Sequence, residues 1–375
     1  MKSKSLKHPY VYLKKQFARP EKYLRKIEAV ARRGDFTLGK EVTVFEAQAA
    51  RMLGVKHVVG VGNGTDAIYL VLKALGIGVG DEVITAPNSF VATAAAIALT
   101  GARPVFADVR DDYTIDPVLI GKVITKKTKA IIPVHLTGQP ADMKPIMAIA
   151  KRHNLAVVED VAQAFLARYD GKYLGTIGTA GAFSFHPMKI LHVWGDGGMI
   201  TTNDGALAAN LKLWRNHGLK TRNDVEFFAH NSRLDTIHAA IASVLLPQMP
   251  GVVKKRQAIA RLYDQLLKPL VHSVHIPDRN LCAAPQSHTY TNYVVMAKRR
   301  DDLIAYLAAQ GIEAVIQYPI PIHRQKAARY LGYKKGDLPV CERQAGEIVT
   351  LPCNQYLKRE DIVSVCRAIE KFYSL

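Results

Sequence analysis

The stretch LAVVEDVAQAFLARYDGKYLGTIGTAGAFSFHPMK, residues 155–189, begins and ends with short apolar runs that each lead to a chemically reactive side chain. Residues 155–159 are typical of a buried strand, and Asp160 follows them directly. Residues 181–185 are typical of a second strand, and Lys189 comes shortly after it. The stretch therefore predicts a carboxylate and an amine at the ends of two neighbouring strands.

A carboxylate and an amine in this arrangement are what pyridoxal phosphate requires of a protein. The amine of Lys189 would bond to the aldehyde carbon of the cofactor. The carboxylate of Asp160 would keep the pyridine nitrogen protonated, so that the ring can accept electrons from a substrate carbon. Two solvated surface charges can share the same spacing, so the surrounding residues must support this interpretation.

Between residues 56 and 202, apolar strand-like runs alternate with amphipathic helical stretches. Fully apolar strands that alternate with helices favour an α/β fold with a mostly parallel sheet between helices. Ligands of such sheets bind beyond the strand ends. The predicted strands are 56–61, 82–86, 103–107, 129–134, 156–159, 182–185 and 198–201, and the helices between them include 65–75, 91–99 and 143–153.

After residue 202 the pattern becomes helical, and a smaller mixed segment follows it. We predict a first part over residues 1–250, the N-terminal segment and a large cofactor-binding domain, and a small α+β C-terminal domain over residues 251–375. The elements expected there are helices at 205–216, 234–244, 252–267, 301–310 and 359–373, and strands at 290–297 and 313–317.

The segment GNGTDA, residues 62–67, joins the first predicted strand to the first predicted helix. Small residues such as Gly64 let the backbone approach a ligand, and a helix N-terminus offers free N–H groups to a phosphate. Thr65 could donate its hydroxyl to that phosphate or cap the helix. Ser184, near the end of its strand, could reach the same phosphate or bond to neighbouring backbone.

Two more residues fit the same cofactor. Phe90 precedes the helix at 91–99 and could offer an aromatic face to a flat ring, although a core position would also explain it. Gln163 comes three residues after Asp160, where a turn could direct its amide to the phenolic oxygen of the cofactor.

The composition is that of a globular protein, with 375 residues of which 49% are hydrophobic and 22% charged. No apolar stretch approaches the roughly 20 residues needed to span a bilayer, so we expect no membrane segment. The start of the chain lacks the apolar core of a secretion signal, and the four cysteines show no CxxC spacing. We therefore expect free thiols, no metal site and a cytoplasmic location. The net charge of +19 has two interpretations, attraction to an anionic partner or charges spread over solvated faces. Aromatic residues do not interleave with the basic ones, which disfavours nucleic-acid binding.

Several segments together resemble one known family. The chain is similar, from about Pro9 to Tyr373, to the DegT/DnrJ/EryC1/StrS family of pyridoxal-phosphate nucleotide-sugar aminotransferases, which have the aspartate aminotransferase (type I) fold. The matching segments occur in the family's order: FTLGKEVTVFE, GNGTDAIYLVLKALGIGVGDEVI, PNSFVATAAAI, GARPVFADV, TKAIIPVHLTGQPADM, VVEDVAQAF, GAFSFHPMK, GDGGMITTND, NSRLDTIHAAI and YPIPIH.

The resemblance implies an activity and its cofactor. An amino group would pass from an amino acid, usually glutamate, to a keto group of a nucleotide-linked sugar. Pyridoxal 5'-phosphate would serve as cofactor and pyridoxamine phosphate as its intermediate form. The product would be an amino sugar for surface polysaccharide or a glycosylated metabolite. The GDGG turn at 195–198 favours family members that act at carbon 3 of the sugar.

The resemblance also implies roles for single residues. Lys189 matches the Schiff-base lysine, and Asp160 matches the partner of the pyridine nitrogen. The remaining matches are Gln163 near the phenolic oxygen, Phe90 stacked on the ring, Gly64, Thr65 and Ser184 around the phosphate, and Tyr318 and His323 in the loop of the sugar pocket. Asn231 matches a residue that reaches the phosphate from a second subunit, which implies a homodimer with a shared active site.

Some positions depart from the family pattern. Residues 190–194, ILHVW, are bulkier than usual, and Phe165-Leu166 replaces a histidine–glycine pair. Two other functions remain alternatives. One is a sugar dehydratase of the same family, in which the lysine is usually replaced or an iron–sulfur site is added. The other is a non-catalytic, polyanion-binding regulator on the same fold, which the charge of +19 suggests. The retained Lys189 disfavours both.

Overall fold

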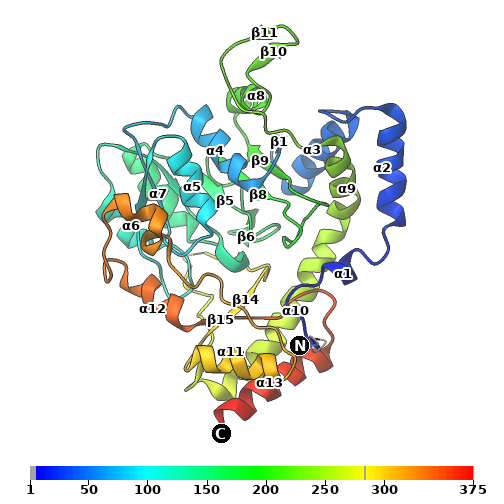
Figure 1. Ribbon diagram of the computed structural model, residues 1–375. Coiled ribbons are helices and arrows are strands. Elements are labelled where there is room, and N and C mark those ends of the chain that lie inside the picture. Colours follow the sequence, from blue (N-terminus) through cyan, green and yellow to red (C-terminus); the bar gives the residue numbers. More distant parts are fainter. Residues whose placement is uncertain (1–5, 283, 375) are drawn as a thin grey trace.

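A seven-stranded sheet forms the centre of the protein (Figure 1). The structure is a computed structural model that describes residues 6–282 and 284–374. The strand order is β1-β9-β8-β5-β4-β2-β3, and β9 is antiparallel to both of its neighbours while all the other pairs are parallel. The strands are β1 (His57–Val61), β2 (Glu82–Thr85), β3 (Arg103–Phe106), β4 (Thr128–Ile132), β5 (Ala156–Asp160), β8 (Ala180–Ser184) and β9 (Gly198–Thr202). This confirms the predicted mostly parallel sheet and its seven strands.

Helices cover both faces of this sheet, because each inner strand carries apolar side chains on both sides. In β5, Val157 belongs to one buried cluster and Val158 to the other. Helices α4 (Gly64–Ala74), α5 (Val91–Leu99) and α8 (Gly205–Trp214) contribute to the cluster of Val158. The opposite cluster receives side chains from α3 (Lys40–Leu53), α6 (Pro117–Val123), α7 (Met143–His153) and α9 (Thr236–Leu245).

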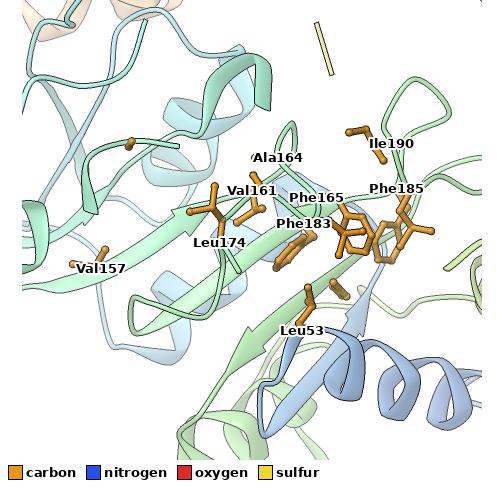
Figure 2. Packing of buried hydrophobic residues seen from close by; sticks show 14 of the residues in the cluster. Leu53, Val157, Val161, Ala164, Phe165, Leu174, Phe183, Phe185 and Ile190 are labelled. Atoms are coloured by element: carbon orange, nitrogen blue, oxygen red, sulfur yellow. The ribbon is translucent and has the colours of Figure 1, made fainter. Parts of the chain in front are cut away.

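Phenylalanine side chains fill the core beside the reactive loops. Figure 2 shows Phe165, Phe183 and Phe185 packed among aliphatic residues. The rings of Phe165 and Phe183 lie 6.1 Å apart in an edge-to-face arrangement, and Leu166 is also buried. The departure from the family's histidine–glycine pair therefore adds apolar packing beneath the site and no polar group.

The C-terminal part has its own small core. An antiparallel sheet of β12 (Val274–His275), β14 (Tyr293–Ala297) and β15 (Ile348–Leu351) packs against α10 (Met249–Leu267), α11 (Arg300–Ala309) and α13 (Arg359–Tyr373). Side chains between residues 322 and 341, among them Ile322 and Leu338, join the large core instead. A domain boundary near residue 250 remains a prediction. The other elements are α1 (Leu13–Gln16), α2 (Glu21–Arg33), α12 (Pro339–Glu347), β6 (Arg168–Tyr169), β7 (Lys172–Tyr173), β10 (Leu219–Thr221), β11 (Asp224–Val225) and β13 (Gln286–Ser287).

The strand predicted at 313–317 is wrong. Only Val315 forms an isolated bridge, and its partner is Thr350 of β15. Pairing cannot continue because the chain enters the loop YPIPIH, in which Pro319 and Pro321 have no N–H to donate. The helix predicted at 359–373 ends where α13 ends.

One stretch of the described chain, Thr236–Leu270, is long and apolar enough to cross a membrane by length and composition. It consists of α9, α10 and two short 3-10 turns, one after each helix, and half of its most apolar window is buried inside the protein. Core helices of globular proteins commonly pass the same test.

Candidate active site

The predicted reactive residues meet at one edge of the sheet. Asp160 is the last residue of β5 and pairs with Ala182 of the parallel strand β8, which ends at Ser184. Strand β1 runs in the same direction as β8, because β9 is antiparallel to both. The segment after β1, which contains Gly64, therefore emerges at the same edge.

Asp160 is a buried carboxylate with only hydrogen-bond donors beside it. Its side chain is 6% exposed. Thr93 Oγ1 donates to Oδ2 over 2.8 Å, and the backbone N–H of Ala162 donates to Oδ1 over 3.1 Å. Within the described residues, no cationic side chain lies within 4.0 Å of it. A buried carboxylate is costly without a compensating charge, so this position suits a protonated pyridine nitrogen.

Lys189 lies in the loop after β8 and carries a half-buried amine. Its backbone N–H bonds to His186 O, but in the described part of the chain its amine makes no hydrogen bond and no ion pair. Burial lowers the pKa of this amine below its ordinary value, and the nearby charge of Asp160 offsets only part of that effect. The neutral, nucleophilic form of Lys189 is therefore more accessible than in a surface lysine.

The N-terminus of α4 and Ser184 form a narrow cradle. A Cβ atom on Gly64 would lie 2.7 Å from the Cβ of Ser184, so only glycine permits this approach. Asn63 caps the helix, since its side chain accepts a hydrogen bond from Asp66 N over 2.8 Å. The capping alternative for Thr65 is therefore wrong, and its hydroxyl is not needed for the helix end.

Gln163 and Tyr318 form a hydrogen-bonded pair beside Asp160. Gln163 is 7% exposed, and its Nε2 donates to Tyr318 Oη over 3.3 Å. Its Oε1 accepts from Thr137 N and Asn292 Nδ2. Because Nε2 carries two hydrogens, one N–H of this amide remains for another acceptor. Burial, the nearby charge of Asp160 and the opposing bond from Gln163 together raise the pKa of Tyr318 to about 12.

Phe90 precedes α5, and its ring lies 5.5 Å from that of Tyr318 with an angle of 40° between the planes. Its side chain is 51% exposed in the single chain, so the alternative that Phe90 is a core aromatic is wrong. An exposed ring beside a buried carboxylate can cover one face of a flat ligand.

Two of the predicted residues do not join this cluster. His323 is buried, and its Nε2 lies 2.9 Å from Glu342 Oε1 while its ring contacts Phe106 and Tyr333. None of these partners belongs to the cluster. Asn231 is exposed and forms a backbone bridge with Asn216.

Thr93 was not predicted from the sequence. It lies in the apolar helix VATAAAIAL, where the one hydroxyl side chain is the only indication of a polar partner. The donor at Asp160 comes from a residue 67 positions away, and no local pattern relates the two.

The residues present fit pyridoxal phosphate: a narrow cradle with free N–H groups, a buried carboxylate, a free amine and an exposed aromatic ring. Among the described residues, no group of three or more histidine, cysteine, aspartate or glutamate side chains could hold a metal ion. The four cysteines are free.

Comparisons with known proteins identify the family. The family model of the DegT/DnrJ/EryC1/StrS aminotransferase family matches residues 19–370. A "Pleiotropic regulatory protein" of Geobacillus stearothermophilus is 43% identical over 368 residues, which are 97% of this chain and 98% of the relative. A "dTDP-3-amino-3,6-dideoxy-alpha-D-galactopyranose transaminase" of Aneurinibacillus thermoaerophilus is 40% identical over 367 residues, 97% of this chain and 99% of the relative.

Among solved structures, DesV of S. venezuelae "in complex with ketimine intermediate" superimposes with a TM-score of 0.95 and 36% identity, covering 99% of this chain and 100% of that chain. The chain therefore belongs to the DegT/DnrJ/EryC1/StrS aminotransferase family, and it has the fold of a pyridoxal-phosphate-dependent aminotransferase.

Proposed function

We propose that this protein moves an amino group from glutamate to a keto group at carbon 3 of a nucleotide-linked sugar. The observation that carries the proposal is a lysine amine, that of Lys189, without a hydrogen bond near a buried Asp160 carboxylate that forms no ion pair among the described residues. The relative from Aneurinibacillus thermoaerophilus is named for a dTDP-linked 3-amino sugar, which supports both the nucleotide-linked substrate and carbon 3.

Bound pyridoxal phosphate supplies an electron sink for the bonds of the substrate carbon. Lys189 would hold the cofactor through its amine, and the neutral amine would accept and return a proton. Its lowered pKa supports this role, because only the neutral amine accepts a proton. Asp160 would stabilise positive charge on the bound ring, and Thr93 holds the carboxylate in place.

The remaining residues orient the ligand. The N-terminus of α4 and the hydroxyls of Thr65 and Ser184 would bind phosphate oxygens. The free N–H of Gln163 would donate to the phenolic oxygen, and Phe90 would cover the ring. Tyr318, which contacts both Gln163 and Phe90, would line the sugar pocket.

The proposal includes a homodimer in the cytoplasm. Asn231 would reach the phosphate site of a second copy, and its exposure in the single chain supports this arrangement. The segment 219–231, with β10 and β11, projects from the body of the protein (Figure 1), and Phe228 on it is 97% exposed. Val225 on the same segment is also exposed, and together the two side chains offer apolar surface to another copy. The amino sugar would serve a surface polysaccharide or a glycosylated metabolite.

One relative favours a second candidate. The Geobacillus stearothermophilus protein, 43% identical, is named as a regulator and not as an enzyme. A regulator that makes no use of amino transfer would have no need for Lys189 and its lowered pKa. The two functions therefore differ in whether the protein carries out chemistry with glutamate.

The test is the first half of the reaction. Protein loaded with pyridoxal phosphate is mixed with L-glutamate, and the cofactor absorbance and 2-oxoglutarate are both measured. We expect the absorbance band to shift and one equivalent of 2-oxoglutarate to form per site. D-Glutamate serves as the control. Cofactor uptake without 2-oxoglutarate would favour the regulator, and no uptake would contradict the proposal.

A further inference from the structure

The N-terminal arm, residues 6–19, crosses from the small C-terminal core to the loop that carries Lys189. Backbone hydrogen bonds join the arm to the turn after α11: His8 N donates to Gly311 O, and Glu313 N donates to His8 O, both over 3.1 Å. The carboxylate of Glu313 also accepts from Tyr10 N over 2.8 Å. One side of the arm is therefore fixed to the C-terminal part.

The other end of the arm packs against the loop that carries Lys189. The ring of Phe17 lies 5.4 Å from that of His192 and 5.9 Å from that of Trp194, both edge-to-face. Both residues belong to the stretch 190–194 that is bulkier than the family pattern. Between the two anchors, Tyr12 Oη accepts from Arg256 Nη2 over 2.8 Å. Tyr10 is thus held on a segment that is fixed at both ends.

The phenol of Tyr10 closes a ring of three hydrogen bonds. Tyr10 Oη donates to Asn292 Oδ1 over 2.6 Å, and Asn292 Nδ2 donates to Gln317 Oε1 over 2.7 Å. Gln317 Nε2 then donates back to Tyr10 Oη over 3.0 Å. Burial raises the pKa of the Tyr10 phenol, so it keeps the proton that this direction requires. The three hydrogen bonds therefore orient the side-chain amides of Asn292 and Gln317.

The second N–H of Asn292 connects this ring to the candidate active site, because it donates to Gln163 Oε1 over 3.2 Å. We infer that Tyr10 is a positioning residue that keeps the Gln163 amide nitrogen in place at the cofactor, an inference that rests on the proposed function. The backbone N–H of Thr137 also donates to Gln163 Oε1, over 2.9 Å, so the oxygen stays on that side of the amide. Without the hydroxyl of Tyr10, Asn292 can rotate and present its oxygen to the oxygen of Gln163. Two facing oxygens repel, so the Gln163 amide shifts away from Asn292 and its nitrogen loses its position at the cofactor.

The test measures how the protein holds the cofactor, apart from turnover. Pyridoxal phosphate is titrated into the cofactor-free protein, and the pH midpoint of the bound absorbance band is recorded. We expect Tyr10→Phe to weaken the affinity for pyridoxal phosphate about three- to tenfold. We also expect it to raise the pH midpoint, because a lost donor no longer favours the deprotonated phenolic oxygen. Gln317→Met breaks the same ring from its other side and should act in the same direction.

Tyr12→Phe is the matched control, since it removes a hydroxyl from the same arm that bonds to Arg256 and not to the ring. The second control is the Gln163→Leu background, in which Tyr10→Phe should have no further effect on either measurement. The inference is overturned if Tyr10→Phe behaves like Tyr12→Phe, or if its effect persists without the Gln163 amide. A wild-type protein that binds no cofactor would overturn the proposed function as well, which distinguishes the two failures.

Discussion

Gly64 and Ser184 approach each other so closely that a Cβ atom on the glycine would stand 2.7 Å from the serine Cβ. The contact brings the N-terminus of α4 against the end of β8. It joins the segments that follow β1 and end β8, which are far apart in the chain.

Gly64→Ala should therefore displace the cradle. We expect a loss of about 1–3 kcal/mol in the free energy of unfolding, because a tight contact is overpacked, and a weaker affinity for pyridoxal phosphate. Chemical denaturation and cofactor titration measure the two effects. Gly121→Ala in α6 is the control, since its Cβ would meet nothing within 4 Å, and it should be neutral or stabilising. Equal behaviour of the two variants would contradict the cradle.

Lys189→Ala should reduce amino transfer by at least about a thousandfold, because the protein loses both the bond to the cofactor and the proton carrier. Reduction with borohydride followed by peptide mass mapping should label Lys189 in the wild type and nothing in the variant. Lys172→Ala, at an exposed position of β7, is the control and should keep the label. A label on another lysine in the wild type would remove Lys189 from the proposed mechanism.

Asp160→Asn keeps the size of the side chain and the Thr93 contact but removes the negative charge. We expect amino transfer to fall by about a hundredfold or more, since the developing charge on the ring loses its stabilising partner. Steady-state kinetics should place the loss mainly in kcat. Thr93→Val, which leaves the charge and removes one donor, should have a smaller effect in the same direction. A larger effect of Thr93→Val would be inconsistent with the carboxylate's role.

The pH dependence follows from the lowered pKa of Lys189. A lowered pKa means that the amine becomes neutral at a lower pH than an ordinary lysine. The rate at which cofactor-free protein captures pyridoxal phosphate should thus rise with pH and level off below pH 10.5, the ordinary pKa. The free energy of unfolding should also rise with pH through this window, because the unfolded chain binds the extra proton. A capture rate that still climbs at pH 10.5 would show an unperturbed amine.

Much of the fold could be predicted because its strands are apolar on both faces. Residues 156–159 carry no helical periodicity, and the chain alternates such runs with amphipathic stretches. The antiparallel direction of β9 has no such signature, since a buried strand looks the same in either direction. The prediction was wrong at 313–317, where Val315 alone pairs with a neighbouring strand, at Thr350.

Some residues of the candidate site could also be predicted from the sequence, and others could not. Asp160, Ser184 and Gly64 were predictable because each adjoins a strand or helix boundary. Thr93, Tyr10 and Asn292 were not, because their roles arise from hydrogen bonds between residues as far as 282 positions apart. The family resemblance predicted that His323 lies in the loop of the sugar pocket. Its hydrogen bond to Glu342 depends on α12, a helix that was not predicted from the sequence.

The most direct test of the account is the second half of the reaction. Protein loaded with pyridoxamine phosphate is mixed separately with nucleotide-linked sugars that carry a keto group at carbon 3 or carbon 4, and the cofactor band and product mass are recorded. The account predicts that the pyridoxal band returns with a carbon-3 keto sugar and that the product is its amino sugar. A return with carbon-4 keto sugars alone, or no return with either set of sugars in protein that has reacted with glutamate, would contradict it.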